Sequence, residues 1–565
     1  MSMNTQTSFQ KTSLTLPILV AGMVGLCSAG VWAQLIPDAG RLLNDVQKSE
    51  RETRIRTAPV DVIEERAPRP AISLPEGAQV PVTRFRITGN KSFEREALDE
   101  LVKPWEGRTL DVNGLNDAAG AITRHYQSRG FLLAYAYLPA QKVEQGVIEI
   151  AVLEGTVDAV QIVTAQDVRL ADEVIQKHVD GITQSPQVLQ ADLERRLLLL
   201  NDIPGVVARA SFTPGARPGT ADVVVTVVEE EPLVQSVEFN NQGSGSTGEF
   251  RLGAQLHFRN LFGVGDSTHL HLQASQGGEL VSGSLGTRVP IGGQGWSAEA
   301  SISHLTYELG EPYASLGARG EANALRFGLN YQLRRSMTSN ISLTGSYDFK
   351  DLSDVLEFIS SNKKHSHQFS LGVNASRQDE WLGGGSVQST LGVTSGSLAW
   401  DSGNVLGQNA ASHFTKISYD LSRTQALVSD WQGSFRLTGQ HALDTLDSSE
   451  KFSLTGPFGV RAYAPGQANV DLGSVLALEL NRSWVINGRT VAGSIFYDAG
   501  IGQYSVDPAP NVQNYIKLQG IGLGLNWTNG GDTEMGVTAA WRGRRQMSVD
   551  ADRRPYIYFQ VKKGF

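Results

Sequence analysis

Apolar and polar residues alternate through most of the second half of the chain. Apolar side chains occupy every second position of 250–258, and the same pattern returns in 325–333, 417–421 and 521–527. A period of two predicts β-strands that have one apolar and one polar face. Residues 232–565 are therefore predicted to be all-β.

A soluble β-sandwich gives the same local alternation, so other features must separate the two architectures. The runs last about ten residues, the length that a tilted strand needs to cross a bilayer. Aromatic residues such as Phe258, Tyr331 and Trp527 end the apolar faces, as in the girdles of membrane barrels. These features predict an outer-membrane barrel of about sixteen antiparallel strands. Phe565, at the end of the last strand, is expected to act as the signal for barrel assembly.

The connections between the predicted strands alternate in length, as the short periplasmic turns and long outer loops of such barrels do. The short turns are 262–266, 335–339, 426–431, 484–489 and 528–532. The long loops are 309–321, 351–364, 400–412, 443–473, 503–513 and 542–554.

Strands and helices follow one another in the first half of the chain. Residues 81–155 predict a β-α-α-β-β unit, whose longer helix runs from about Val112 to Arg129. The same order returns in 156–231 and indicates a structural repeat. Two tandem binding domains of the ordinary α+β class would give the same periodicity.

The N-terminus has the pattern of a secretion signal. An apolar stretch follows Lys11, and Val31-Trp32-Ala33 fits a cleavage site, so residues 1–33 are predicted to be a signal peptide. Residues 34–52 predict a helix with a thin apolar stripe, and the proline-rich segment 53–80 predicts a linker. A short, mostly polar helix is unstable alone, so it must dock elsewhere.

Composition narrows the class of protein further. The net charge of −9 argues against a basic nucleic-acid-binding surface. Charged residues make up 19% of the chain, below the roughly 25% of soluble domains, and its 60 glycines suit a β-protein with many turns. The single cysteine, Cys27, lies in the predicted signal peptide, so the mature chain is expected to have no thiol chemistry.

Signals for a cofactor or an enzyme are weak. Residues 243–248 match G-x-G-x-x-G, but predicted strands flank them on both sides, whereas a dinucleotide site needs a helix after the loop. His257, His269 and His271 could line one lumen wall and hold zinc, although polar lining is the simpler interpretation. We expect no cofactor, no metal and no catalytic residue.

Three short motifs occur on the predicted barrel. They are Val460-Arg461-Ala462-Tyr463 in the longest loop, Phe496, Asp498 and Gly500 on a late strand, and Asn260, Gly263, Gly265 and Asp266 in the first turn. With two small units and a tethered helix before the barrel, the chain resembles the TpsB transporters of two-partner secretion, the family of haemolysin and filamentous-haemagglutinin secretion proteins. The two units resemble polypeptide-transport-associated (POTRA) domains. Ala462 departs from the family's pattern, which has glycine at this position.

The resemblance implies the location and the working parts of a secretion pore. It places the barrel in the bacterial outer membrane and the POTRA units in the periplasm. It implies that the longest loop folds into the lumen, where Arg461 meets Asp498. Alternation along 491–502 turns Asp498 inward, which is compatible with this pair. The helix of residues 34–52 would plug the pore at rest.

The resemblance also implies the partners. The client would be a secreted TpsA-type protein, an adhesin or haemolysin, bound unfolded at an exposed POTRA strand edge. The candidate edges are 207–212 and the strand that carries Val147, Ile148, Ile150 and Val152. The barrel assembly machinery and membrane lipids would be further partners, and a monomer is expected. An outer-membrane insertase, which shares this architecture, and a barrel enzyme or passive porin are the alternatives.

Overall fold

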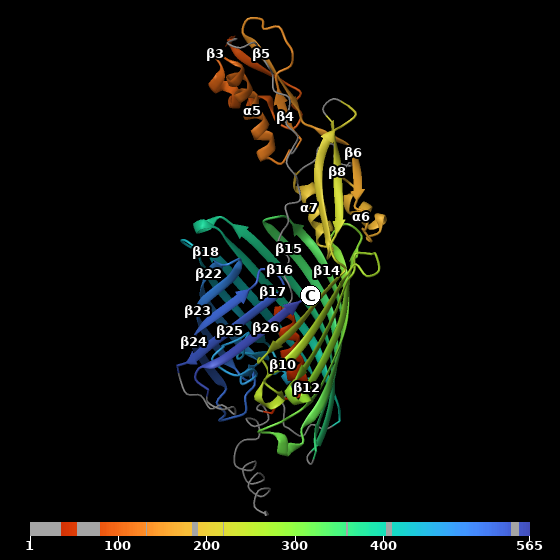
Figure 1. The fold of residues 1–565 in the computed structure, drawn as a ribbon, viewed down its shortest axis with the longest axis vertical. Helices are drawn as coiled ribbons and strands as arrows, with labels where there is room; N and C mark the ends of the chain where they lie inside the picture. The colour runs from red at the N-terminus through yellow and green to blue at the C-terminus, as the bar shows by residue number, and fades with distance from the viewer. Residues whose placement is uncertain are drawn as a thin grey trace, which may run out of the picture.

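The computed structural model shows an elongated molecule, with a β-barrel at one end and two small α+β units at the other (Figure 1). It describes residues 36–53, 79–131, 133–182, 190–217, 220–357, 360–402, 410–543 and 553–565. The predicted signal peptide and most of the predicted linker lie outside the described residues. Within the described part, no helix is both long and apolar enough to cross a membrane.

Sixteen antiparallel strands form the closed barrel, which confirms the predicted architecture. Each strand pairs with its neighbour in the chain, and the last strand, β26, pairs with the first, β9. The strands are β9 (Leu233–Asn240), β10 (Arg251–Arg259), β11 (Ser267–Ser275), β12 (Leu280–Ile291), β13 (Trp296–Glu308), β14 (Arg319–Arg335), β15 (Ser339–Leu356), β16 (Ser360–Asp379), β17 (Gly385–Ser402), β18 (His413–Ala426), β19 (Trp431–Ala442), β22 (Leu472–Ile486), β23 (Arg489–Gln503), β24 (Tyr515–Thr528), β25 (Thr533–Arg542) and β26 (Tyr556–Gly564). Short 3-10 turns lie in the connections at η2 (Gly245–Thr247), η3 (Gln276–Gly278), η4 (Ala314–Leu316) and η5 (Trp381–Gly383).

The alternation in the sequence corresponds to the two faces of the barrel wall. On β23, Ile495 and Tyr497 face outward and are 52% and 41% exposed. Phe496 and Asp498, which alternate with these two residues, point inward and are 2% and 0% exposed. A strand with lipid on one side and the lumen on the other needs this period of two.

One predicted long loop, residues 351–364, is mostly strand. β15 continues to Leu356 and β16 already begins at Ser360. The alternation of apolar and polar residues fades here, which made these residues look like a loop, but the backbone ladder continues. The register still pairs Asp351 with His365 and Asp354 with Asn362.

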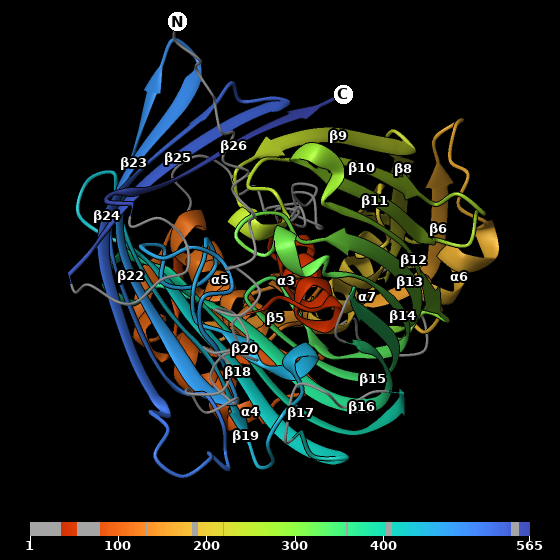
Figure 2. The same cartoon turned by 90° about the horizontal axis from the view of Figure 1, so that it is seen from below.

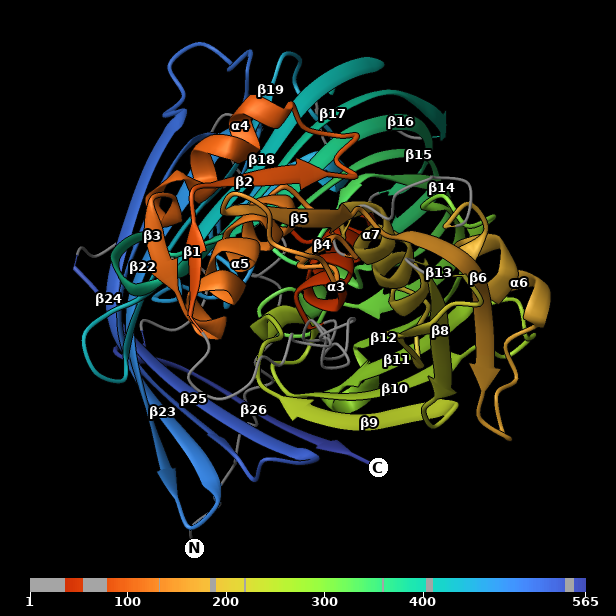
Figure 3. The same ribbon diagram turned by 90° about the horizontal axis from the view of Figure 1, so that it is seen from above.

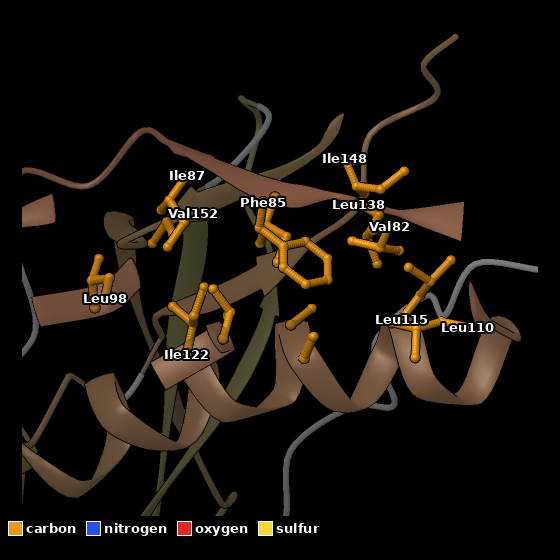
Figure 4. Close-up of a cluster of buried hydrophobic side chains, with 14 of the residues drawn as sticks. Val82, Phe85, Ile87, Leu98, Leu110, Leu115, Ile122, Leu138, Ile148 and Val152 are labelled. Atoms are coloured by element: carbon orange, nitrogen blue, oxygen red, sulfur yellow. The ribbon is translucent and has the colours of Figure 1, made fainter. Parts of the chain in front are cut away.

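The first α+β unit contains β1 (Val80–Val82), β2 (Arg84–Thr88), α4 (Arg95–Val102), η1 (Lys103–Trp105), β3 (Arg108–Leu110), α5 (Val112–Ser128), β4 (Tyr135–Tyr137) and β5 (Val147–Leu153). Two helices pack on one face of its sheet. Phe85 from β2, Val152 from β5 and Ile122 from α5 meet in the core (Figure 4). Asp111 caps α5, because its Oδ1 accepts the Gly114 backbone N–H at 2.8 Å.

The strand at Val147–Leu153 is not a free edge, contrary to the prediction. The sheet order is β2-β5-β4, so β5 is its central strand and pairs on both sides. Ile148, Ile150 and Val152 point into the core of the unit, and Val147 begins the strand. An edge strand and a central strand share the same alternation, so the sequence alone could not distinguish them.

The second unit repeats the predicted order with β6 (Thr156–Thr164), α6 (Asp172–Val179), α7 (Gln190–Asn201), β7 (Val206–Pro214) and β8 (Thr220–Glu229). Its sheet order is β6-β8-β7, so β7 is an edge strand, as expected for residues 207–212. Ile175, Leu197 and Val225 are fully buried in its core. This unit lies between the first unit and the barrel (Figure 1).

Candidate functional site: the lumen and the periplasmic mouth

The longest outer loop folds back into the barrel. This segment, residues 443–471, is called the lumen loop here; it contains η6 (Ser448–Glu450), β20 (Phe452–Ser453) and β21 (Asn469–Val470). β20 and β21 pair as a short hairpin, and the Val460 N–H donates to the Leu454 carbonyl at 2.8 Å. Val460, Ala462 and Tyr463 are buried in one apolar cluster with residues of β22 to β25.

Arg461 lies at the tip of the lumen loop and meets Asp498 on β23. Its Nε donates to Asp498 Oδ2 at 2.9 Å and its Nη2 to Oδ1 at 2.8 Å, a two-pronged ion pair. The Arg461 backbone N–H also donates to Oδ2, at 3.0 Å. The guanidinium lies 3.3 Å from the ring centroid of Phe496, in cation–π geometry.

Glu479 on β22 is a second acidic partner of Arg461, and the sequence analysis missed it. Arg461 Nη1 donates to Glu479 Oε2 at 2.8 Å. Glu479 pairs with Phe496 in the register of β22 and β23, so it points to the same side of the wall as Phe496. The sequence did contain a signal for Glu479, namely a polar residue at a lumen-facing position between two apolar neighbours.

Residues without side chains make room for the loop. A Cβ on Gly520 would lie 2.6 Å from the Cβ of Ala462, and one on Gly500 would lie 2.9 Å from a methyl of Val460. Ala462 is not among the described non-glycine residues with positive φ. Alanine therefore fits this backbone without left-handed strain.

Tyr463 ties the lumen loop to the last strand. Its carbonyl accepts the Tyr558 hydroxyl at 2.8 Å, and the Arg542 guanidinium lies 5.5 Å from its ring centroid. Tyr558 belongs to β26, the strand that closes the barrel against β9. The loop thus contacts strands on both sides of Asp498.

Buried ion pairs hold the base of the lumen loop, and no motif in the sequence marked them. Lys350 and Lys416 both bind Glu450, at 2.7 and 2.8 Å. Lys364 binds Asp447 at 2.8 Å, and the paired side chains are 2% and 1% exposed. Such pairs depend on partners far apart in the chain.

Helix α3 (Ala39–Thr53) lies inside the barrel (Figure 2). Its thin apolar stripe, Leu42, Leu43 and Val46, is buried against apolar side chains of β12 to β15 such as Leu305 and Leu352. The stripe that was too small to stabilise an isolated helix therefore finds its partner on the lumen wall.

Polar contacts of α3 reach both the lumen loop and the strands. The Ser448 hydroxyl donates to Asp38, just before the helix, and Asn44 Nδ2 donates to the Lys451 carbonyl at 3.0 Å. Near the other end, Glu50 binds His271 at 2.8 Å and Glu52 binds Arg436 at 2.5 Å. The helix therefore spans the lumen from the base of the loop toward the periplasmic half.

The first-turn motif has a structural role at the other mouth of the barrel. Asn260 has a positive φ of 51°, and its Oδ1 accepts the Gly265 N–H at 2.8 Å. Asp266 accepts the N–H groups of Leu261 and Phe262, at 3.2 and 2.8 Å. These bonds fix the turn, and the Gly263 carbonyl accepts the Ala171 N–H of the second α+β unit at 2.9 Å.

Glu229 joins this turn to the second unit. Its carboxylate accepts the Asn260 amide at 2.9 Å, the Arg169 backbone N–H at 2.6 Å and the Arg169 guanidinium at 2.8 Å. Burial opposes the charge, but the hydrogen bonds from Asn260 and Arg169 outweigh it and lower the pKa of Glu229.

A second periplasmic turn, between β14 and β15, also holds the second unit. Arg335 at the end of β14 binds Asp202 at 2.8 Å, and the Met337 N–H donates to Glu194 of α7 at 2.6 Å. Arg195 donates to the Gln332 carbonyl at 2.6 Å. The second unit is thus fixed on the side of the mouth formed by β10 to β15 (Figure 3).

His257 and His271 are lumen residues with polar partners. His257 binds the Ser267 hydroxyl at 2.8 Å, and His271 binds Glu50 of α3. Among the described residues, no group of three or more His, Cys, Asp or Glu is placed to hold a metal ion.

Phe565 and the strand at 147–153 lie away from the lumen site. Phe565 is 69% exposed, and its N–H donates to the Gln235 carbonyl of β9 at 3.0 Å, where the barrel closes. Val147, Ile148, Ile150 and Val152 belong to the first α+β unit.

Family models match two parts of the chain. The model described as haemolysin secretion/activation protein ShlB/FhaC/HecB matches residues 219–527, and the model of the ShlB-type POTRA domain matches residues 80–155. The first match covers more than half of the 565 residues.

Individual proteins similar to this chain agree with the family models. The heme/hemopexin transporter protein HuxB of Haemophilus influenzae strain 86-028NP is 28% identical over 476 residues, which are 81% of this chain and 83% of the relative. The outer membrane transporter CdiB of Escherichia coli O6:K15:H31 strain 536 is 24% identical and covers 80% of this chain and 76% of its own. A solved structure of CdiB from Escherichia coli has the same fold, with a TM-score of 0.70 at 22% identity over 94% of this chain and 99% of the other.

Proposed function

The chain belongs to the ShlB/FhaC/HecB family of haemolysin secretion/activation proteins, outer-membrane transporters that export partner proteins, and from this premise we propose how it handles its client. The client arrives unfolded in the periplasm, pairs with the edge of β7, passes through the lumen when α3 leaves it, and folds outside. The protein has no catalytic step of its own in this scheme. The observation that carries the proposal is α3 inside the lumen of a closed barrel.

We place client capture on β7 because its edge is regular. β7 pairs with β8 over nine residues without a break, and its other side has no strand partner in the sheet. β6, the opposite edge, has an irregular register between Val157 and Val160. An extended chain adds most readily to a regular edge, because bulges disrupt the hydrogen-bond ladder.

Photo-crosslinking tests this assignment. A crosslinking residue at Arg209 or Thr213, both exposed on β7, should capture the secreted partner during export. Thr226 is the matched control, since it is exposed and pairs with Arg209 but lies on the central strand β8. Equal capture at Arg209 and Thr226 would place the client elsewhere. Deleting this protein tests export itself, because every partner that it exports should then no longer be secreted.

The family match favours a secretion pore over the two alternatives, an outer-membrane insertase and a barrel enzyme or passive porin. A structure of BamA from Haemophilus ducreyi has the barrel fold at a TM-score of 0.54 and 15% identity, which indicates shared fold only. A passive porin would not need two periplasmic units or a helix in its lumen.

We also propose that the protein is a monomer that the barrel assembly machinery inserts through its last strand. Phe559 on β26 and Phe565, the residue after that strand, face outward, as Ile557 does. Phe565 contacts β9 where the barrel closes, so an assembly signal at this residue would be read before closure.

A further inference from the structure

A polar cavity lies inside the barrel where α3, the lumen loop and β10 meet. Its volume is about 540 Å³, and part of it is open to solvent. Arg41, Asp45 and Lys48 line it from α3, and Arg251 lines it from β10. Apart from these four charged residues, the lining is neutral. This space is called the α3 cavity here.

Arg251 is buried in the wall of the cavity without an acceptor. The residue begins β10 and is 6% exposed, and its register partner Asn240 is buried on the same side of the wall. Its Nε is buried and has no hydrogen-bond partner among the described residues. Glu238, which β9 turns to the lumen, binds the Asn240 amide at 2.7 Å instead. Because a buried charge without a partner is costly, this guanidinium is placed to receive an anion.

Arg41 and Lys48 face the same cavity, because they lie two turns apart on one side of α3. Arg41 Nε is buried and has no hydrogen-bond partner in the described part of the chain. A Cβ on Gly466 would overlap the Arg41 guanidinium, so this glycine leaves room for it. Lys48 donates to the Ser453 carbonyl at 3.4 Å and lies 5.3 Å from the ring centroid of Phe452. Both of these partners of Lys48 are neutral.

The charges of the α3 cavity do not balance. Asp45 is the one acidic residue of the lining, and its charge acts on all three cations. One carboxylate can neutralise only one of them, so the cavity keeps an excess of two positive charges. Water in the cavity would solvate these groups but would leave the excess in place.

We propose that the α3 cavity binds a small tetrahedral oxyanion of charge −2, such as sulfate or hydrogen phosphate, between Arg41, Lys48 and Arg251. The charge of such an ion equals the excess. Its four oxygens can accept hydrogen bonds from several donors at once, and the planar guanidinium fits this geometry. The ion would come from solution, because the cavity lies inside the barrel, away from the lipid headgroups.

The bound ion would join the helix to the wall. Arg41 and Lys48 belong to α3, whereas Arg251 belongs to β10. Without the ion these like charges repel one another, and with it each of them is attracted to a shared partner. The ion therefore stabilises α3 in the lumen. This consequence rests on the proposed function, in which α3 leaves the lumen, whereas the binding site itself does not.

Binding of radiolabelled sulfate to the purified full chain tests the site. We expect one sulfate per chain, displaced by phosphate but not by chloride at equal ionic strength. Arg251→Gln and Lys48→Gln should each weaken binding at least tenfold. Arg326→Gln is the matched control and should bind as the wild type does, because Arg326 lies on β14 outside the cavity and has Asp348 as its partner.

Lys48→Gln keeps the test decisive if Arg251→Gln fails to fold, since Lys48 lies on α3 and not in the barrel wall. Heat-dependent gel mobility shows which variants contain a folded barrel. Wild-type binding by folded Lys48→Gln, or equal displacement by chloride, would overturn the proposal, because the sulfate would then be an adventitious ion only.

Channel recordings in planar bilayers test the effect of the ion on α3. Replacing chloride by sulfate at constant ionic strength should lower the frequency of channel openings at least threefold. Lys48→Gln should not respond. An equal response of Lys48→Gln, or none in the wild type, would overturn the bridge between helix and wall. Neither measurement uses the client, so export itself is still decided by the secretion assay.

Discussion

Single residues decide how the lumen loop is held. Among the described residues, Arg461 is the only cation at the loop tip whose side chain donates three hydrogen bonds to the wall. Two of these go to Asp498 and one goes to Glu479. Asp498 is fully buried, so its charge depends on this partner. Breaking a buried pair from one side costs about 3–5 kcal/mol, because the other charge stays behind.

Asp498→Asn should detach the loop tip and reduce secretion at least tenfold. The barrel should still assemble, because the strand ladder of β23 does not use this side chain. Secretion and the heat-dependent gel mobility of the folded barrel are the two measurements. Glu479→Gln is the graded comparison and should have a smaller effect, since Arg461 keeps Asp498. Wild-type secretion by Asp498→Asn would refute the role of this pair.

The close approach of Ala462 to Gly520 gives a second prediction. Gly520→Ala should displace the loop tip, because its Cβ would lie 2.6 Å from that of Ala462. Ala462→Gly removes the clash, so the double variant should regain much of the lost secretion. The measurement is secretion by the two single variants and the double variant. Additive losses in the double variant would show that these residues do not meet.

Elements are joined by turns that look ordinary in the sequence. The turn after β10 binds the second α+β unit through Glu229 and Ala171. The turn between β14 and β15, which holds Arg335 and Met337, binds Glu194 of α7 and Asp202 just after that helix. The motif at 260–266 therefore fixes the position of a periplasmic unit, and its glycines allow close approach. Gly265 leaves room for Ile203, which a Cβ would meet at 3.1 Å.

The lowered pKa of Glu229 predicts that this joint weakens in acid. A carboxylate with a depressed pKa in the docked state stabilises docking fully at neutral pH, and this contribution is lost as the pH falls through the lowered pKa. The loss should therefore appear below the ordinary glutamate value of about 4.3.

Spin labels at Glu173→Cys on α6 and Asp430→Cys in the turn before β19 report this joint. The distance distribution should be narrow at neutral pH and broaden in acid. The distance distribution of Glu229→Gln should be broad at both pH values, since the glutamine amide accepts fewer of the hydrogen bonds from Asn260 and Arg169 and carries no charge. A distribution that broadens equally in acid with Glu229→Gln would mean that another group is responsible.

The whole molecule couples α3 to the lumen loop and the wall. The helix contacts the loop through Asp38 and Asn44, and the strands through Glu50 and Glu52. Water and a passing chain can replace these polar contacts when the helix leaves, and only the thin stripe of Leu42, Leu43 and Val46 loses an apolar partner. A helix held only by a large apolar face would leave more slowly.

Deleting residues 34–52 should therefore open the pore. Channel conductance in planar bilayers should rise severalfold, because α3 fills space that ions could use. A disulfide between Asp38→Cys and Ser448→Cys, whose side chains touch, should do the reverse and block secretion until a reductant is added. Each single-cysteine variant is the control. Unchanged conductance after the deletion would contradict a plug.

The sequence by itself determined the elements, because a period of two and a period of 3.6 are local properties of the chain. It predicted the barrel with its sixteen strands, the two α+β units and the inward face of Asp498. Only the tertiary structure decided which strand is central, where β15 ends, which acid joins Arg461 besides Asp498, and what Glu229 holds. These features depend on contacts between residues distant in the chain, such as Ser448 with Asp38 or Arg436 with Glu52. Such contacts form only once the barrel has closed.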